Sequence, residues 1–185
     1  MSKFTFTKLS IPEVILIEPK TFKDHRGFFM ETYNEKEFIE GGINERFVQD
    51  NLSFSLSGVI RGLHFSLPPH ETAKLVRCAS GEVLDVAVDV RPRSSTFGTW
   101  VSAILSADNH KMLFVPKGFA HGFCVLSETA HVAYKVTDYY RPENDFGISF
   151  KDPDIAIDWP VQNPILSEKD ENLPSLKSFI EKLKQ

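Results

Sequence analysis

The chain of 185 residues carries a formal net charge of −4, and its acidic and basic residues are interspersed along most of its length. Such a distribution offers no basic face to nucleic acid or to an anionic membrane surface, so neither is expected as a partner. With 42% hydrophobic residues, no apolar run of about 18 residues and no apolar signal-peptide core near the N-terminus, the sequence indicates a cytoplasmic protein of one domain, residues 1–185.

Short segments rich in Val, Ile and Phe alternate with turns rich in Gly and Pro, which predicts many strands and few helices. In chain order, we expect strands over residues 14–17, 27–33, 47–53, 59–65, 74–79, 82–90, 100–105, 112–115, 122–126 and 131–138. Short helices are expected near residues 34–40 and from about Pro174 onward. This order is typical of a mainly β protein, a sandwich or barrel with a core over about 45–150 and both terminal segments packed on it.

Two of the expected strands have a clear alternation of side chains. In the strand at 82–90, Leu84 and Val86 share one face while Asp85 and Asp89 share the other, so we expect a sheet with one apolar and one wet face. In the strand at 131–138, Tyr134 falls on the same face as its valine neighbours. Tyr134 is therefore expected on the apolar side of its sheet.

The two cysteines lie in apolar, strand-like contexts and form no CxxC pair. A disulfide framework or a zinc knuckle would need closer or more numerous cysteines. We expect Cys78 and Cys124 to be buried, reduced thiols.

His64 lies between two large apolar residues and raises the question of a metal site. The β-barrels called cupins often bind a metal through an HxH pair, a nearby glutamate and a later histidine in a PxGxxH turn. The turn is present as PKGFAH at 116–121, but Ser66 stands where the second histidine would be. His70 and Glu71 are possible substitutes in a loop after a double proline. The sequence does not supply a regular ligand set, and we expect no metal.

Two other interpretations of His64 remain. It could be a core histidine whose ring nitrogens bond to the backbone. Against this, Arg61, Lys74 and Arg77 cluster in neighbouring apolar strands, and a cleft that receives an anion explains them better than burial without partners. A strict pleat would place Arg61 and His64 on opposite faces, so we expect a bulge at Gly62 that turns both inward.

Seven motifs in one order and spacing resemble the dTDP-4-dehydrorhamnose 3,5-epimerase family: FVQDN at 47–51, VIRGLHF at 59–65, KLVRCASGEVLDVAVDVR at 74–91, STFGTW at 95–100, PKGFAHGF at 116–123, YKVTDYY at 134–140 and LSEKD at 166–170. The resemblance implies a cupin-type jelly-roll barrel with short peripheral helices and a homodimer. It also implies a nucleotide-linked 4-keto-6-deoxyhexose as substrate, a dTDP sugar first of all, with no cofactor and no metal.

The resemblance also implies roles for individual residues. His64 corresponds to the base, Asp170 to the carboxylate that orients it, Tyr134 to the proton donor, and Lys74 to a cation facing the sugar. Residues that correspond to substrate-binding positions are Arg26, Glu31, Gln49, Asp50, Asn51, Arg61, His121, Tyr140, Asp145 and Lys169. The region around Arg26 and Glu31 would reach into the partner's site.

The residue types suit the inversion of a carbon beside a ketone. The ketone at C4 already acidifies C3 and C5, so neither a nicotinamide nor a metal is needed. Histidine, with an ordinary pKa near 6.5, can accept the proton, and tyrosine, near 10, can return one from the other face. An aspartate fixes the tautomer of the histidine, and a lysine ammonium stabilises the enolate oxygen.

Each role has a structural alternative. Tyr134 could be an ordinary inward-facing aromatic residue, and Asp170 could close a helix cap with Ser167. His121 could bond within its own turn, and Lys74 could be a solvated charge at a strand end, as could Arg61.

The chain departs from the family's pattern at His25, Ser66, Thr72, Asp145 and Phe150. These departures leave the proposed catalytic residues in place. The main hypothesis is therefore inversion of C3 and C5 of dTDP-4-dehydro-6-deoxy-D-glucose to give dTDP-4-dehydro-L-rhamnose, in deoxysugar biosynthesis. The alternatives are inversion of C3 or C5 alone, a sugar linked to another nucleotide, and a barrel that binds nucleotide sugars without catalysis.

Overall fold

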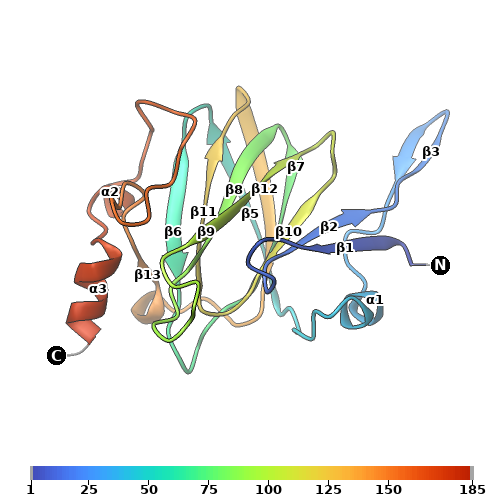
Figure 1. Cartoon of the computed structure of the whole chain (residues 1–185). Coiled ribbons are helices and arrows are strands. Elements are labelled where there is room, and N and C mark those ends of the chain that lie inside the picture. The colour runs from blue at the N-terminus through green and yellow to red at the C-terminus, as the bar shows by residue number, and fades with distance from the viewer. Residues whose placement is uncertain (1, 184–185) are drawn as a thin grey trace.

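The computed structural model describes residues 2–183 and is built mainly from antiparallel strands in two facing sheets (Figure 1). The six-stranded sheet has the order β1 (Phe4–Lys8), β2 (Ile15–Pro19), β10 (Met112–Val115), β7 (Lys74–Ser80), β12 (Thr129–Val136), β5 (Gln49–Leu56). The five-stranded sheet has the order β13 (Phe146–Gly147), β6 (Ile60–Phe65), β11 (Phe119–Val125), β8 (Glu82–Asp89), β9 (Trp100–Ser106). This confirms the expected β-rich, cupin-type architecture.

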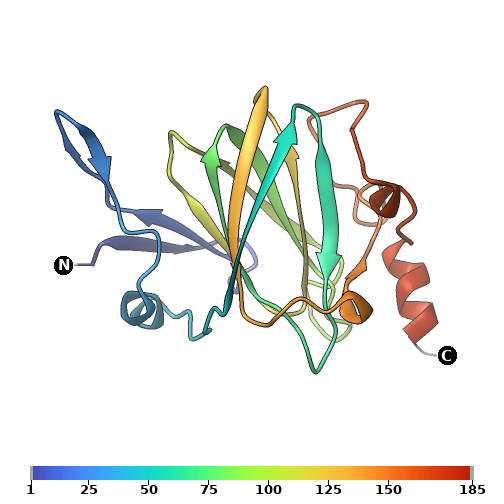
Figure 2. The ribbon, with the colours of Figure 1, turned by 180° about the vertical axis from the view of Figure 1, so that it is seen from behind.

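Every strand expected between residues 47 and 138 is present, with ends that differ by a few residues. Three strands were not expected: β1, whose FTFTK sequence pairs with β2, the strand at Phe22–Asp24, and the short β13 beside β6. A separate two-stranded hairpin, β3 (Phe22–Asp24) and β4 (Gly27–Phe29), projects from the N-terminal end of the molecule in both ribbon views (Figure 2).

The helices lie outside the two sheets. They are α1 (Glu35–Glu40), the 3₁₀ turn η1 (Pro142–Asn144), α2 (Glu168–Glu171) and α3 (Leu176–Leu183). The α1 helix begins where the Asn34 side chain accepts a hydrogen bond from the Glu37 backbone, a typical N-cap. The α2 and α3 helices lie beyond β6 and β13, at the opposite end from the hairpin (Figure 1). In the part of the chain that the structure describes, no helix has both the length and the hydropathy needed to cross a membrane.

Three groups of buried apolar side chains hold the elements together. One fills the space between the sheets and includes Val76, Phe123 and Val132. A second covers the outer face of the five-stranded sheet, where Phe179 of α3 packs. A third packs Phe38 of α1 against the six-stranded sheet. Because part of each outer face is covered in this way, the described terminal segments are part of the fold rather than appendages.

The expectation of a wet face on β8 is wrong. Asp85 and Asp89 are both fully buried, on the face of β8 that points into the space between the sheets. The opposite face, with Val86 and Val88, is covered by the C-terminal segment. Buried carboxylates require partners. Asp85 bonds His121, which is distant in sequence, and Asp89 bonds Arg91, which follows the strand. Alternation in the strand alone does not reveal them.

The expected bulge at Gly62 is confirmed by the pairing of β6 with β11. His64 pairs with His121, and Arg61 pairs with Phe123. Between these two pairs β6 therefore contains one residue more than β11, which is a β-bulge. Gly62 has φ +116°, and a Cβ atom there would lie 2.7 Å from Gly122 Cα. Only glycine fits this close approach of two strands. The bulge lets Arg61 and His64 line the same cavity.

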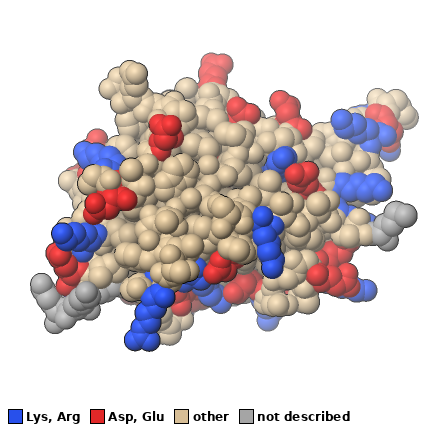
Figure 3. Space-filling model, viewed as in Figure 1, with Lys and Arg blue, Asp and Glu red and all other residues tan. Residues whose placement is uncertain are grey.

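Charge is distributed evenly over the face shown in Figure 3, where lysines and arginines alternate with acidic residues around an uncharged centre. No large patch of one sign occurs on that face. This agrees with the interspersed charges of the sequence.

Candidate active site

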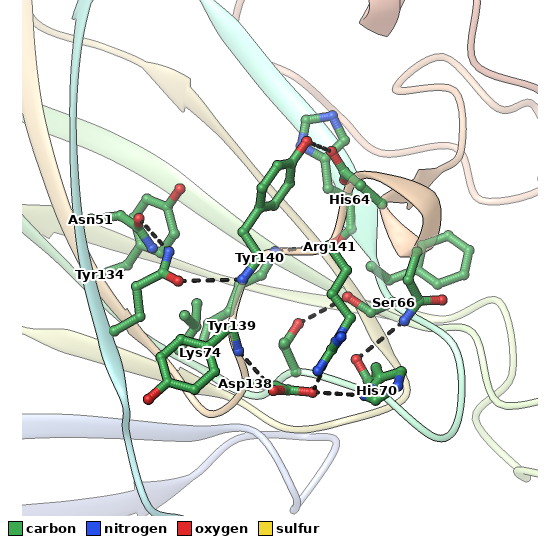
Figure 4. Close-up of a pocket in the computed structure, with 16 residues that line it drawn as sticks. Asn51, His64, Ser66, His70, Lys74, Tyr134, Asp138, Tyr139, Tyr140 and Arg141 are labelled. Carbon is green, nitrogen blue, oxygen red and sulfur yellow. Dashed lines mark hydrogen bonds and ion pairs between the residues drawn. The ribbon is translucent and has the colours of Figure 1, made fainter.

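Two adjoining cavities open between the sheets and share His64, Lys74 and Tyr134. The first cavity extends past Ser66 toward Tyr140, and Figure 4 shows the side chains that line it. The second cavity is lined by Ser53, Arg61, His64, Lys74, His121, Phe123, Tyr134, Ser167, Lys169 and Asp170. All four residues expected to be catalytic therefore meet at one place, although they come from β6, β7, β12 and α2.

His64 is oriented by Asp170. The Nε2 atom of the imidazole lies 2.6 Å from Oδ1 of Asp170, whose side chain is 4% exposed, while the His64 side chain is 30% exposed. Burial alone would raise the pKa of Asp170, but the hydrogen bond and charge of His64, with bonds from Ser167 and the Gly62 backbone, lower it below its usual value. An ionised carboxylate on Nε2 leaves Nδ1 as the ring nitrogen that can accept a proton.

Lys74 lies at the start of β7, and its Nζ donates a hydrogen bond to the backbone carbonyl of His64 at 3.3 Å. Burial lowers the pKa of Lys74 to about 8, an effect that the charges of Asp145 and Asp85 oppose in part. The ammonium is therefore charged at neutral pH but is held in a poorly solvated place. There it can act on a developing negative charge more strongly than in water.

Tyr134 faces the interior, as the alternation of β12 predicts, and packs against the apolar group between the sheets. Burial raises the pKa of Tyr134, with Asp145 contributing and Arg61 opposing. Its hydroxyl makes no hydrogen bond with any described residue. Because β12 belongs to the six-stranded sheet and β6 to the five-stranded one, Tyr134 and His64 approach the cavity from opposite walls.

A second histidine–aspartate pair lies beside the first. Nε2 of His121 is 2.9 Å from Oδ1 of the buried Asp85, and His121 is the strand partner of His64. Burial lowers the pKa of His121, and the nearby charges of Lys74 and His64 add to this, while Asp85 opposes it. His121 bonds across the sheet rather than within its own turn. The partner Asp85 was missed by the sequence analysis.

The histidines around the cavities pair one to one with carboxylates. Among residues 2–183, no group of three or more His, Cys, Asp or Glu side chains is arranged to hold a metal ion. His64 and His121 each bond a different carboxylate, and His70 bonds Asp138 at the far end of the first cavity.

Cationic and acidic groups line the rim. Arg61 donates hydrogen bonds to Ser55 Oγ at 2.9 Å and to the Phe54 carbonyl at 3.0 Å. The Lys169 ammonium lies 2.6 Å from Asp145 Oδ2. The Tyr140 hydroxyl donates to that same carboxylate oxygen at 3.2 Å. Arg61 and Lys169 line the second cavity, and Tyr140 and Asp145 line the first.

Successive residues of β5 point alternately into the first cavity and to the other side of the sheet. Gln49 and Asn51 line the first cavity and bond each other at 2.9 Å. Gln49 also accepts a hydrogen bond from the Tyr140 backbone. Asp50, also expected to bind substrate, faces the other side of the sheet and pairs with Lys135 at 2.7 Å.

Two other expected substrate-binding residues lie away from the cavities of this chain. Arg26 is at the hairpin between β3 and β4 and pairs with Asp24 at 2.6 Å. Glu31 follows the hairpin and pairs with Lys3. Neither lines the first or the second cavity. One chain alone therefore does not bring them to the site.

Several lining residues were not in the expected set. Ser66 and Thr72 line the first cavity and bond each other at 3.1 Å. Each stands two positions from an expected catalytic residue, just outside the strand that carries it, so extending the alternation past the strand ends could have predicted them. Asp138 and Asn144 also line it. They belong to an irregular segment after β12, where sequence periodicity gives no such signal.

The chain is similar in sequence and fold to several sugar-nucleotide epimerases. The family model described as dTDP-4-dehydrorhamnose 3,5-epimerase matches residues 8–178. The dTDP-4-dehydrorhamnose 3,5-epimerase of Shigella flexneri is 55% identical over 166 residues, 89% of this chain and 92% of the relative. That of Methanothermobacter thermautotrophicus is 51% identical over 180 residues, 96% and 97% of the two chains. The crystal structure of the 3,5-epimerase of Legionella pneumophila in complex with dTDP-4-keto-L-rhamnose has a TM-score of 0.93 and 48% identity, and covers 97% of this chain and 96% of that one.

Proposed function

The chain belongs to the dTDP-4-dehydrorhamnose 3,5-epimerase family, and on this basis we propose that it inverts C3 and C5 of dTDP-4-dehydro-6-deoxy-D-glucose to form dTDP-4-dehydro-L-rhamnose. The observation that carries the proposal is the meeting of His64, paired with Asp170, with Lys74 and Tyr134 around one space between the sheets. A base, a cation and a hydroxyl in that arrangement are the groups that inversion beside a ketone requires.

The proton leaves the sugar by transfer to His64. Its Nδ1 atom takes the proton from the carbon beside the C4 ketone, and the electron pair of that C–H bond moves into the enolate. The Asp170 carboxylate at 2.6 Å stabilises the imidazolium that forms. The Tyr134 hydroxyl then gives its proton to the same carbon from the opposite wall, which inverts the centre. Bulk water restores both side chains for the next carbon.

Lys74 stabilises the enolate oxygen. Its ammonium lies in the same cavities as the base and the hydroxyl, and it carries its charge at neutral pH because the lowered pKa of about 8 is still above 7. The negative charge on O4 appears only as the proton leaves. A cation aimed at that oxygen therefore lowers the barrier more than it tightens ground-state binding.

The substrate's diphosphate lies near Arg61 and Lys169. Both cations line the second cavity, on the Asp170 side of the catalytic group. A guanidinium suits phosphate oxygens because it presents several N–H donors in a fixed plane. Lys169 would exchange part of its contact with Asp145 for the phosphate.

The assembly is a homodimer. Three outward side chains of the edge strand β5 are large, apolar and exposed: Leu52 at 67%, Phe54 at 51% and Leu56 at 54%. The hairpin carries Phe28 and Phe29, which are 54% and 65% exposed. Exposed apolar groups on an edge strand favour association. A second copy that covers them would also allow the hairpin to bring Arg26 to the partner's cavity.

Two buried free thiols support a reducing compartment. Cys78 and Cys124 are both free and buried, as expected, and burial raises the pKa of the Cys124 thiol to about 11. The cytoplasm is the location that we propose.

The configuration of the product tests the reaction. The protein is incubated with dTDP-4-keto-6-deoxy-D-glucose, borohydride then fixes the keto sugar as 6-deoxyhexoses, and these are identified by NMR. L-configured 6-deoxyhexoses are expected. Recovery of D-configured sugars alone contradicts the proposal, and inversion at a single carbon supports a one-centre epimerase instead.

A mixing experiment tests the dimer and the role of Arg26. Arg26→Ala and His64→Ala chains are each expected to be nearly inactive. In a hybrid dimer, however, one site has an intact His64 and receives an intact Arg26 from the partner. Recovery of activity after the two variants are unfolded and refolded together supports the shared site. A monomer in sedimentation, or no recovery in a hybrid that forms, contradicts it.

A further inference from the structure

We propose that Asn144 is a positioning residue that fixes the geometry of the base relative to the two carbons it must reach. This inference rests on the proposed epimerase function and adds a residue that none of the sequence motifs assigns. Asn144 lies in η1, in the segment after β12, and lines the first cavity.

The amide of Asn144 binds the loop between β6 and β7 at three points. Its Oδ1 accepts a hydrogen bond from the Leu67 backbone N–H at 3.3 Å. Its Nδ2 donates to the Leu67 carbonyl at 2.9 Å and to the His70 carbonyl at 3.3 Å. One side chain thus uses both its acceptor and its donors on the backbone of a single loop. Such a set holds the loop in one conformation.

That loop joins the two strands that carry the base and the lysine. It begins directly after β6, which carries His64, and ends at Lys74, the first residue of β7. The Lys74 ammonium also bonds the His64 carbonyl. A shift of the loop would therefore move the two groups that act on the reacting carbon and on O4.

A second contact closes the same loop against the same segment. His70 Nδ1 lies 3.1 Å from Asp138 Oδ2, and Figure 4 shows this pair beside Arg141 at the end of the cavity. Near the other end of the segment, Asp145 bonds Lys169, the neighbour of Asp170 in α2. The segment from 138 to 145 therefore connects the loop with the element that orients the base.

The reaction explains why the loop between β6 and β7 must be held in one position. One base must remove protons from C3 and from C5, which lie on either side of the ketone, so its position must serve two carbons. Misplacement of a reacting group by about 1 Å can cost about 100-fold in rate. If the loop loosens, one carbon is expected to fall out of reach sooner than the other. The ratio of the reaction rates at C3 and C5 therefore reports the position of His64 relative to the two carbons.

The test compares Asn144→Ala and Asn144→Asp with the wild-type protein by NMR in heavy water, with dTDP-4-keto-6-deoxy-D-glucose as the probe. Asn144→Asp retains the size and the acceptor, but replaces the donors by an oxygen that repels the two carbonyls. For both variants we expect kcat to fall by about 10- to 100-fold and the ratio of deuterium uptake at C3 and C5 to change at least about threefold, with the affinity for dTDP unchanged.

Asn109→Ala is the matched control. Asn109 also makes three side-chain bonds to backbone groups, of Ile104, Ser106 and Lys111, in the turn between β9 and β10. Its loss should lower the melting temperature comparably and leave the C3 to C5 ratio at the wild-type value.

The outcomes separate this inference from the function on which it rests. If the wild-type protein exchanges at both carbons and the Asn144 variants keep its ratio, or lose both rates only in proportion to unfolded protein, the positioning role is wrong while the function stands. If Asn144→Asp behaves like the wild type, the amide merely fills space, and the inference is again wrong. If the wild-type protein exchanges at neither carbon, the proposed function fails and this inference with it.

Discussion

The carboxylate of Asp170 lies 2.6 Å from Nε2 of His64, across 106 positions of sequence. Asp170 is in the first turn of α2, where the Ser167 side chain accepts a hydrogen bond from its backbone N–H. The sequence offered two roles for Asp170, in a helix cap and as the partner of a base. The structure combines them, because the cap uses the Asp170 backbone and leaves the carboxylate to bond His64.

Asp170→Asn is expected to lower kcat by about 100-fold or more, because a neutral amide does not stabilise the imidazolium that forms when His64 takes the proton. The rate of inversion, followed by NMR, measures the effect.

Ser167→Ala separates the two roles of Asp170. It removes the cap and leaves the carboxylate, so it should cost about 1 kcal/mol of unfolding free energy and only a small part of kcat. If both variants lost activity equally, the carboxylate would have no role beyond the fold.

Tyr134→Phe is expected to separate exchange from inversion. Without the hydroxyl, His64 can still remove a proton and return one from solvent to the same face, so deuterium enters the sugar while the configuration is retained. Net inversion should fall by about 100-fold or more. His64→Ala should lose both processes. Inversion at the wild-type rate in Tyr134→Phe would show that another group delivers the proton.

Lys74 is expected to set the alkaline limit of activity. Its ammonium is needed and its pKa is lowered to about 8, so the charge that Lys74 supplies is present below that pH, and kcat/KM should decline as the pH rises through it. The raised pKa of Tyr134 keeps the hydroxyl protonated over this range. Lys74→Arg keeps its charge to a higher pH. The pH profile of kcat/KM in Lys74→Arg, although lower throughout, should therefore lack this decline. A decline at the same pH in both proteins would contradict the assignment of the alkaline limit to Lys74.

Asp89 is expected to contribute to stability in a pH-dependent way. Burial would raise its pKa, but hydrogen bonds from Arg91, Ser94 and Thr96 outweigh this and lower it from 3.8 to about 2. The folded-state pKa is thus depressed, so the contribution is full above the unfolded value and is lost as the pH falls through the folded one. At pH 6 it amounts to about 2 kcal/mol, of which about 1 kcal/mol is lost between pH 5 and pH 3.

Urea unfolding of the wild-type protein and of Asp89→Asn at both pH values measures this. The difference in unfolding free energy between the two proteins should narrow at pH 3. If the difference in unfolding free energy were the same at both pH values, the hydrogen bonds to Asp89 would not lower its pKa in the folded protein.

Local pattern was enough to predict most of the strands and the direction of Tyr134. Alternation and turn residues act over a few positions, and the expected bulge at Gly62 needed only the conflict between Arg61 and His64. The inward face of β8 was misjudged for the opposite reason. Whether Asp85 is wet or buried depends on His121, which reaches it only through the pairing of β11 with β8.

The candidate site was predictable where a motif marked it. His64, Lys74, Tyr134 and Asp170 come from separate motifs, and their meeting in space follows from the family resemblance rather than from any one stretch. The role of Asn144 had no such mark, because its three bonds are made to the backbone of a distant loop. Any residue type offers the same backbone groups, so the sequence of the loop does not show that a side chain binds it.

The incorporation of solvent deuterium tests the central claim most directly. The wild-type protein is incubated with dTDP-4-keto-6-deoxy-D-glucose in heavy water without added cofactor, and the sugar is examined by NMR and mass spectrometry. We predict deuterium at both C3 and C5, and none above the protein-free blank with His64→Ala. Deuterium at neither carbon with the wild-type protein would contradict the account.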